Sequence, residues 1–216
     1  MIEAFLKTIR EVFTPFFWLI LFLNLIITVA FFYGVYQVIS SLIDYYIASY
    51  EWLDKISGVG AMFITYFLFP VIFPLISYLF QDFITSKLNK KYNDTPPKGR
   101  YPISYIIMFA IKFAVISVIL NLLLLPLYFI PVIGLLIYFI LNSYLLGKEY
   151  YQLCAYTLLE KEEIDRFRTH YRNKILLAGM VMSALFLTPI VNIFAPILGV
   201  IYSWFYIQKL NKKFPK

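Results

Sequence analysis

The stretch LLLLPLYFIPVIGLLIYFILN, residues 122–142, contains no charged side chain, yet Pro126, Pro131 and Gly134 lie in its middle. Proline removes a backbone hydrogen-bond donor from a helix, and glycine weakens the helix. Backbone at membrane depth must be hydrogen-bonded within the protein or must line a water-filled cavity, because lipid offers no partners. The stretch therefore predicts a chain reversal between two helical arms inside an apolar segment.

The whole chain has the composition of an integral membrane protein. Its 216 residues are 62% hydrophobic and 14% charged, and the mean hydropathy is +0.77, whereas soluble domains carry about 25% charged residues. A helix needs roughly 20 apolar residues to cross a bilayer. Four uncharged runs exceed that length: residues 12–43, 56–81, 113–147 and 175–208. The first run is too long for the apolar part of a signal peptide, so we expect it to remain as an anchor.

Helix length separates the spanning runs from the hairpins. The first arm of the opening stretch, 113–125, would be about 20 Å long and the second, 132–146, about 22 Å, against roughly 30 Å of hydrocarbon. Prolonging the first arm back to Ile103 would place Lys112 in a helix, which is tolerated only near headgroups or in a protein interior. We therefore predict that residues 103–147 form a hairpin that penetrates the membrane partway and returns.

The last uncharged run repeats this design. Residues 187–205, LTPIVNIFAPILGVIYSWF, carry two prolines and then Gly199, and the flanking arms of about 13 and 12 residues are too short to cross twice. We predict a second hairpin over 175–208. Proline suits the first position of a helix, so Pro131 and Pro196 would each begin a half-helix.

A helix that begins inside the membrane attracts anions. Its first amide groups are unpaired and carry about half a positive charge. Asn192, in the second tip, would add side-chain donors, although asparagines also hydrogen-bond simply between packed helices. The candidate anion-binding residues of the two tips are Pro131, Gly134, Asn192 and Gly199.

Residues 148–174 mix apolar side chains with dense charges of both signs, which predicts amphipathic helices at the membrane surface, linked near 159–162. Arg166 and its neighbouring cations would either collect anions or meet lipid phosphates. Glu149 directly follows Lys148 where the first hairpin would leave the membrane. A gating ion pair of Glu149 with Lys148, with Arg166 or with a neighbouring subunit is one hypothesis for this segment.

The remaining elements complete an all-α integral membrane protein. We predict one long transmembrane helix over 12–43 and a second over 56–92, whose end extends into the cytoplasm. If both hairpins return to the side from which they enter, 18 of the 19 lysines and arginines lie on the side of the two termini. Cytoplasmic loops carry such an excess, so we expect both termini in the cytoplasm and the net charge of +7 to mark that face rather than a nucleic-acid partner.

Few residues are suited to catalysis. Cys154 and His170 are the only cysteine and histidine, so no disulfide forms within the chain, and we predict neither a metal site nor a cofactor. No nucleotide-binding or nucleophile motif is present. We therefore expect the protein not to be an enzyme.

Several stretches resemble one family, the CysZ-type sulfate permeases and the related etoposide-induced membrane proteins. These stretches are VIFPLISYLFQDFITSKLNKKY (71–92), YFIPVIGLLIYFILNSYLLGKEYYQLCAY (128–156), RFRTHYRNK (166–174) and LTPIVNIFAPILGVIYSWF (187–205). The resemblance covers most of the chain from about Phe69 onward. It implies two long crossing helices, two partly penetrating hairpins, and a homo-oligomer in the bacterial inner membrane that passes sulfate inward.

The chain departs from this family at the start of the first membrane helix. Sulfate-transporting relatives carry a Gly-x-Arg-Arg-like element there, whereas REVFTPFFWLI, residues 10–20, retains only Arg10, which Glu11 follows. Arg10 is the remaining candidate for binding the anion at this place, and another small oxyanion, or no transport at all, stays open. The bias of 18 cations to one predicts parallel subunits. The competing hypothesis is a non-transporting scaffold whose half-inserted hairpins wedge one leaflet and organise the bilayer.

Overall fold

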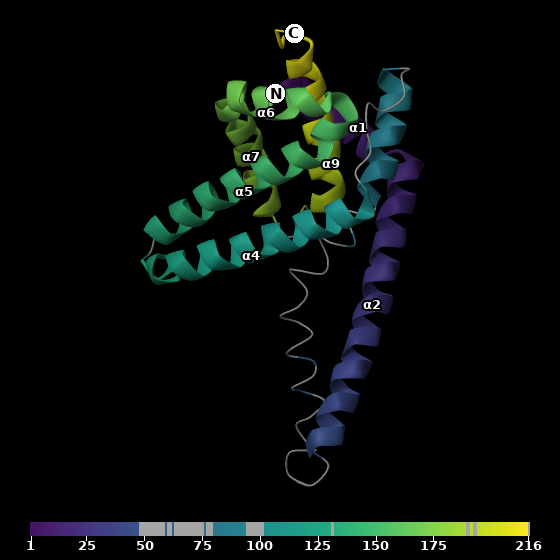
Figure 1. The fold of residues 1–216 in the computed structure, drawn as a ribbon, viewed down its shortest axis with the longest axis vertical. Helices are drawn as coiled ribbons and strands as arrows, with labels where there is room; N and C mark the ends of the chain where they lie inside the picture. Colours follow the sequence, from purple (N-terminus) through teal and green to yellow (C-terminus); the bar gives the residue numbers. More distant parts are fainter. Residues whose placement is uncertain are drawn as a thin grey trace.

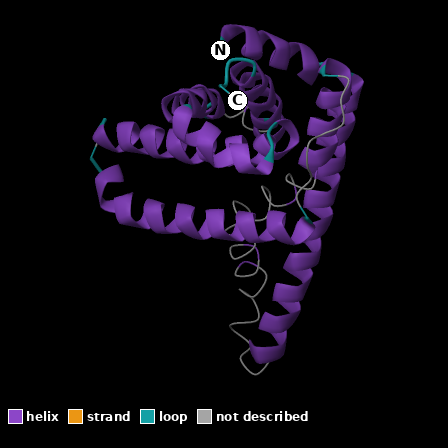
Figure 2. Ribbon diagram, turned by 45° about the horizontal axis from the view of Figure 1, so that its top comes forward, coloured by secondary structure: helices purple, strands orange, loops and turns teal. Residues whose placement is uncertain are grey.

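A computed structural model of the chain describes residues 1–47, 59, 62, 76, 80–93, 102–130, 132–188, 191 and 194–215. Throughout these residues the regular secondary structure is helical (Figure 2), which confirms the predicted all-α class for this part of the chain. The helices are α1 (Ile2–Val12), α2 (Pro15–Ile47), α4 (Ile103–Tyr128), α5 (Ile133–Leu158), α6 (Lys161–His170), α7 (Arg172–Phe186) and α9 (Ala195–Asn211). Residues 80–92 are also helical.

Helix α2 is the long apolar rod that extends away from the other helices (Figure 1). Over Pro15–Ile43 it has 29 residues, enough to cross a bilayer by length and composition, and no other helix in the described residues meets that test. The predicted span 12–43 began three residues too early, because α1 and α2 are separate helices. Thr14 accepts the first hydrogen bonds of α2, from the amides of Phe17 and Trp18, and Pro15 has no amide to donate to α1.

The second predicted span, 56–92, lies largely outside the described residues. Its last part is helical over 80–92, as expected for an extension of a membrane helix. This stretch lies beside the upper end of α2 in Figure 1. It packs on the protein through buried residues such as Ile84 and Leu88, which are 2% and 0% exposed.

The opening stretch of the sequence forms a helical hairpin. Helices α4 and α5 run antiparallel from a turn at 129–132 (Figure 1), and the Tyr105 ring of α4 stacks on Tyr156 of α5 at 6.5 Å near the open end. Val132 has φ 66°, a left-handed conformation that a β-branched residue rarely adopts, so the reversal is tight. Pro131 itself lies outside the described residues.

The arms of this hairpin are longer than predicted. Each helix has 26 residues, or about 39 Å, because α4 does extend back to Ile103 with Lys112 exposed on its surface and Pro126 in its last turn. Arm length therefore does not by itself prevent the hairpin from crossing. Partial penetration of the membrane stays a prediction that depends on the placement of the bilayer.

The segment 148–174 differs from the predicted pair of surface helices. Residues 148–158 continue α5 into the protein core, where Cys154 and Ala155 are fully buried. The predicted link near 159–162 is present, because α6 begins at Lys161 after a capping box between Glu160 and Glu163. The apolar face of α6 also points into the core, since Phe167 is 0% exposed.

The predicted second hairpin, 175–208, corresponds to α7, which begins at Arg172, and α9, which ends at Asn211. Both helices pack mainly on α5, and the connection between them lies largely outside the described residues, so the hairpin itself stays a prediction. Pro196 lies in the first turn of α9, as predicted. Pro189 and Asn192 fall outside the described residues.

The core is where α5, α7 and α9 meet. Helices α5 and α7 approach so closely at Gly147 and Gly179 that a Cβ on Gly179 would overlap the backbone carbonyl of Ser143. Ser143 and Ser183 are also buried, which gives each helix a pair of small residues four positions apart. Such pairs let two helix backbones pack tightly.

Candidate functional site

The hairpin tips were the predicted anion site, and two of their residues are described. Gly134 is buried in the first turn of α5, and its amide donates to the Ile130 carbonyl at 2.8 Å. Gly199 is buried in α9, where a Cβ would overlap the ring of Tyr150. The Tyr150 hydroxyl donates to the Ala195 carbonyl at 3.3 Å, so the start of α9 is held against α5.

These contacts place the two tips far apart within one chain. The start of α9 packs on Tyr150, which is 16 positions after Gly134 in the same helix, or about 24 Å along its axis. Figure 1 agrees, because the α4–α5 turn lies at the far left of the molecule while α9 begins beside the middle of the hairpin. Gly134 and Gly199 are therefore not brought together in the protomer.

The residues of the proposed gate occupy different environments. Lys148 lies with its ammonium nitrogen 5.8 Å from the ring centroid of Tyr144, and the Arg166 guanidinium lies 6.0 Å from the ring centroid of Phe214. Glu149 is 5% exposed and lies within the buried half of α5. The hypothesis of a gating ion pair among Lys148, Glu149 and Arg166 stays a prediction.

Arg10 is exposed at the end of α1, and its neighbour Glu11 is the buried residue of the pair. The Glu11 carboxylate accepts a hydrogen bond from the Lys91 ammonium at 2.6 Å and another from the Tyr92 hydroxyl. Burial, together with the hydrogen bond to Glu11, raises the pKa of Tyr92 to about 12. The phenol therefore stays protonated at neutral pH and stabilises the carboxylate as a donor.

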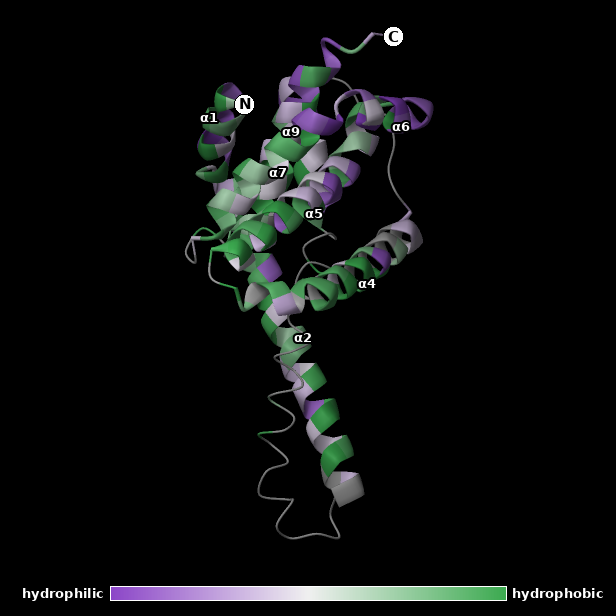
Figure 3. Ribbon diagram, turned by 90° about the vertical axis from the view of Figure 1, so that its left-hand side faces the viewer, coloured by the Kyte–Doolittle hydropathy of each residue, from purple (hydrophilic) through white to green (hydrophobic). Residues whose placement is uncertain are grey.

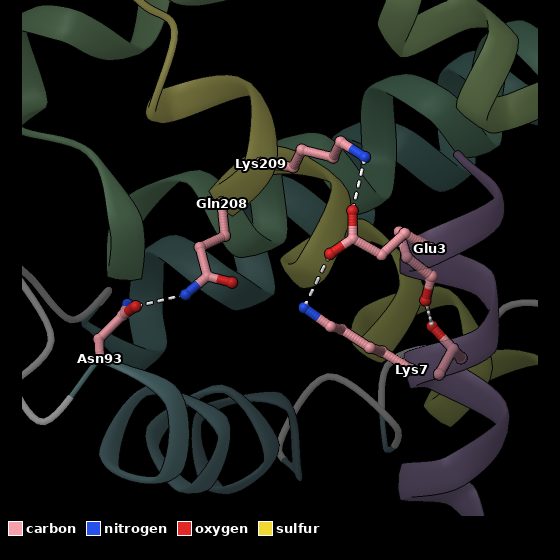
Figure 4. Close-up of polar contacts among 7 residues, drawn as sticks. Glu3, Lys7, Asn93, Gln208 and Lys209 are labelled. Carbon is pink, nitrogen blue, oxygen red and sulfur yellow. Dashed lines mark hydrogen bonds and ion pairs between the residues drawn. The ribbon is translucent and has the colours of Figure 1, made fainter.

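A second set of polar contacts joins α1 to α9. The Glu3 carboxylate accepts hydrogen bonds from Lys209 at 2.7 Å and from Lys7 at 3.1 Å (Figure 4). These ammonium groups, Lys209 foremost, hold the pKa of Glu3 at about 2, below its ordinary value of 4.5. Gln208, beside Lys209, donates to the side-chain oxygen of Asn93 (Figure 4).

We call this assembly the polar junction: Glu3, Lys7, Arg10, Glu11, Lys91, Tyr92, Asn93, Gln208 and Lys209. It draws on α1, residues 80–93 and α9, and it lies at the N-terminal, upper end of α2 in Figure 1. Aromatic contacts tie the same elements together, because the Tyr92 ring lies 4.9 Å from that of Phe205. The junction has more cations than carboxylates and lies at the end of the molecule that carries both chain termini (Figure 1).

Sequence reasoning included Arg10 in the candidate site but missed Lys91 and Tyr92. The available signal was Glu11 itself, a carboxylate directly before a long apolar run, which needs a cation or several donors when it is buried. The sequence offers no means of choosing its partner, because Lys91 is 80 positions away. Among the described residues, no three histidine, cysteine, aspartate or glutamate side chains are grouped as a metal site requires.

The chain matches a known protein family along most of its length. The model of the family described as "Sulfate transporter CysZ/Etoposide-induced protein 2.4" matches residues 4–196, from α1 to the first turn of α9. No curated protein matches the chain. The family match includes the polar junction's α1 and 80–93 elements and the whole of the first hairpin.

Proposed function

The chain belongs to the sulfate transporter CysZ/etoposide-induced protein 2.4 family, and from that membership we propose that it is an anion permease of the bacterial inner membrane with sulfate as its substrate. The family match is the observation that carries this proposal. The helix starts that follow the two tips support it. Apart from the Gly134 amide, which donates to the Ile130 carbonyl, the first amide groups of α5 and α9 are suited to an anion. Pro196 in the first turn of α9 favours such a helix start.

The distribution of charge supports one orientation in the membrane. Hydrophilic residues gather around α6 and the ends of α1 and α9, whereas α2 and α4 are largely hydrophobic (Figure 3). With α2 crossing the bilayer, the basic end that carries both termini would face the cytoplasm. Arg10 would then lie near the cytoplasmic, N-terminal end of α2, and Arg166 on the cytoplasmic side of the protein.

The distance between the tips favours a homo-oligomer. In one protomer the start of α9 packs on Tyr150, about 24 Å along α5 from Gly134. A continuous path lined by Pro131, Gly134 and Asn192 therefore needs tips from neighbouring protomers, whereas Gly199 is covered by the ring of Tyr150 in its own protomer. Parallel protomers would place the same tip residues at the same depth.

Uptake of radiolabelled sulfate into proteoliposomes tests this function. We expect the wild-type protein to accelerate uptake over empty vesicles and Asn192→Leu to reduce it, because leucine removes the amide donors. Asn142→Leu is the matched control, since Asn142 donates to the Tyr138 carbonyl of its own helix at 2.8 Å and lies away from both tips. Uptake no faster than in empty vesicles would reject sulfate transport. Equal uptake by wild type, Asn192→Leu and Gly134→Leu would reject only the tips as the path.

A second candidate function is the non-transporting scaffold. The observation that favours it is the exposed apolar tip of the first hairpin, where Phe129 is 81% and Val132 72% exposed. Such side chains would insert readily between lipid tails and wedge one leaflet. The scaffold predicts that vesicles change shape with protein content while sulfate uptake equals the empty-vesicle rate, and electron microscopy of the same proteoliposomes distinguishes the two functions.

A further inference from the structure

Helix α1 carries an apolar stripe that no part of the described protein covers. Ile2 is 78% exposed, Leu6 60%, Ile9 39% and Phe13 71%. Their spacing of three to four residues places them on one face of the helix. Four large apolar side chains in a row are unusual on a surface that faces water.

The stripe is not a misplaced part of the core, because the opposite face of α1 already packs inward. Ala4, Thr8 and Glu11 are buried there, each 2% exposed. Glu11 is fastened to Lys91, and Glu3 to Lys209, so α1 is held in one rotational setting. Because the opposite face of α1 is packed and held by these ion pairs, Leu6 and Ile9 face outward. An outward apolar face needs an apolar partner.

The position of α1 indicates which partner this is. Phe13, the last residue of the stripe, is two residues before Pro15, where the long apolar helix α2 begins. The chain bends sharply between the two helices, so that α1 runs across the upper end of α2 instead of prolonging it (Figure 2). If α2 crosses the bilayer, α1 lies at the level where the chain enters it.

Two exposed cations lie near the start of α2, at the level of α1. Arg10 is exposed on α1, and Lys87 is exposed on the neighbouring helical stretch, with its ammonium nitrogen 5.1 Å from the ring centroid of Phe16 in α2. Lysine and arginine beside an apolar helix face bind anionic headgroups while the apolar side chains enter the acyl boundary.

We propose that α1 is an interfacial helix that inserts Ile2, Leu6, Ile9 and Phe13 into one leaflet and gathers anionic lipid around Arg10 and Lys87. The partner is the anionic bilayer surface. This role differs from that of residues 148–174, whose apolar side chains are buried in the protein and need no membrane. It also does not depend on sulfate transport.

Site-specific fluorescence quenching in proteoliposomes of phosphatidylcholine and phosphatidylglycerol tests the insertion. An environment-sensitive fluorophore is attached to Leu6→Cys, with Val29→Cys as the lipid-exposed reference on α2 and Glu162→Cys as the water-exposed reference on α6. Cys154, the native cysteine, is fully buried, so the unmodified chain serves as the labelling blank. We expect the Leu6 label to be quenched by nitroxide lipids and shielded from aqueous iodide, as the Val29 label is. Iodide quenching equal to that of Glu162 would overturn the proposal.

A second measurement tests the preference for anionic lipid. The Leu6 label is quenched in turn by nitroxide-labelled phosphatidylglycerol and by nitroxide-labelled phosphatidylcholine at equal mole fraction. We expect roughly twofold or greater enrichment of the anionic lipid, which falls with added salt and in Arg10→Gln. Equal quenching by the two lipids at low salt would overturn the anionic part of the proposal, whichever result the transport assay gives.

Discussion

Glu11 of α1 and Lys91 of the helical stretch 80–92 form an ion pair of 2.6 Å across 80 positions of sequence. The carboxylate side chain is 3% exposed and the lysine side chain 48%. The pair therefore joins two helices that lie at the N-terminal end of α2. It helps to set the orientation of α1 relative to α2.

Replacing Glu11 by glutamine should destabilise the fold. The change removes a charged acceptor from both Lys91 and Tyr92, and hydrogen bonds to charged groups contribute about 1.5–3 kcal/mol each in proteins. We expect the free energy of unfolding in detergent to fall by about 1–3 kcal/mol. Glu3→Gln is the matched control on the same helix, because its carboxylate is exposed and should matter less. Equal losses for the two variants would contradict the assigned role of burial.

The bridge from Glu3 to Lys209 should respond to acid. Since the pKa of Glu3 in the folded protein is about 2, against 4.5 ordinarily, its contribution to stability is complete above pH 4.5 and is lost as the pH falls through about 2. We expect the difference in melting temperature between wild type and Glu3→Gln to be constant above pH 5 and to vanish near pH 2. High salt should shrink it at every pH, because the groups are exposed. A difference that persists unchanged at pH 2 would show that Glu3 acts otherwise.

The crossing of α5 and α7 should not tolerate a methyl group at Gly179. A Cβ there would overlap the Ser143 carbonyl, which is backbone and cannot turn aside. We expect Gly179→Ala to cost about 1–3 kcal/mol or more in the free energy of unfolding. Gly34→Ala in α2 is the control, since a Cβ at that position meets nothing within 4 Å, and alanine is the better helix former by up to about 1 kcal/mol. Similar stability of the two variants would contradict the close approach.

The contact of Gly199 with the Tyr150 ring should appear as coupling between the two positions. Gly199→Ala would push its methyl group into the ring, and Tyr150→Leu removes the ring together with its hydrogen bond to Ala195. We expect Gly199→Ala to cost about 1–3 kcal/mol in the wild-type background and clearly less in the Tyr150→Leu background. A double-mutant cycle from thermal unfolding measures this, and additive effects would show that the ring is not what excludes the methyl group.

Local features of the sequence accounted for the helical class, for α2 and for the turn between α4 and α5. Uncharged runs longer than 20 residues predicted apolar helices, and α2 is one. The breakers around Pro131 predicted the α4–α5 turn, and the proline at 196 lies in the first turn of α9 as expected. These signals act through the few residues next to each breaker, so they can be interpreted without knowing the fold.

The length of an apolar run predicted the ends of the hairpin helices poorly, because a helix can continue beyond its last apolar residue. The charges at Lys148 and Glu149 predict a separate surface element over 148–158, yet α5 continues through these residues. Their apolar side chains, Cys154 among them, are buried by α9, which lies 46 positions further along the chain at Val200. No periodicity within the segment distinguishes a face that meets lipid from one that meets another helix.

The sequence alone thus determined the helical class, the apolar runs, the turn between α4 and α5 and the surplus of basic residues, because each depends on neighbouring residues. Only the tertiary structure decided that Glu11 faces Lys91, that residues 148–158 are core, and that Ile2, Leu6, Ile9 and Phe13 are left uncovered. Those outcomes depend on which helix faces pack together, and that pairing is selected by side chains that are distant in sequence and become neighbours only after folding.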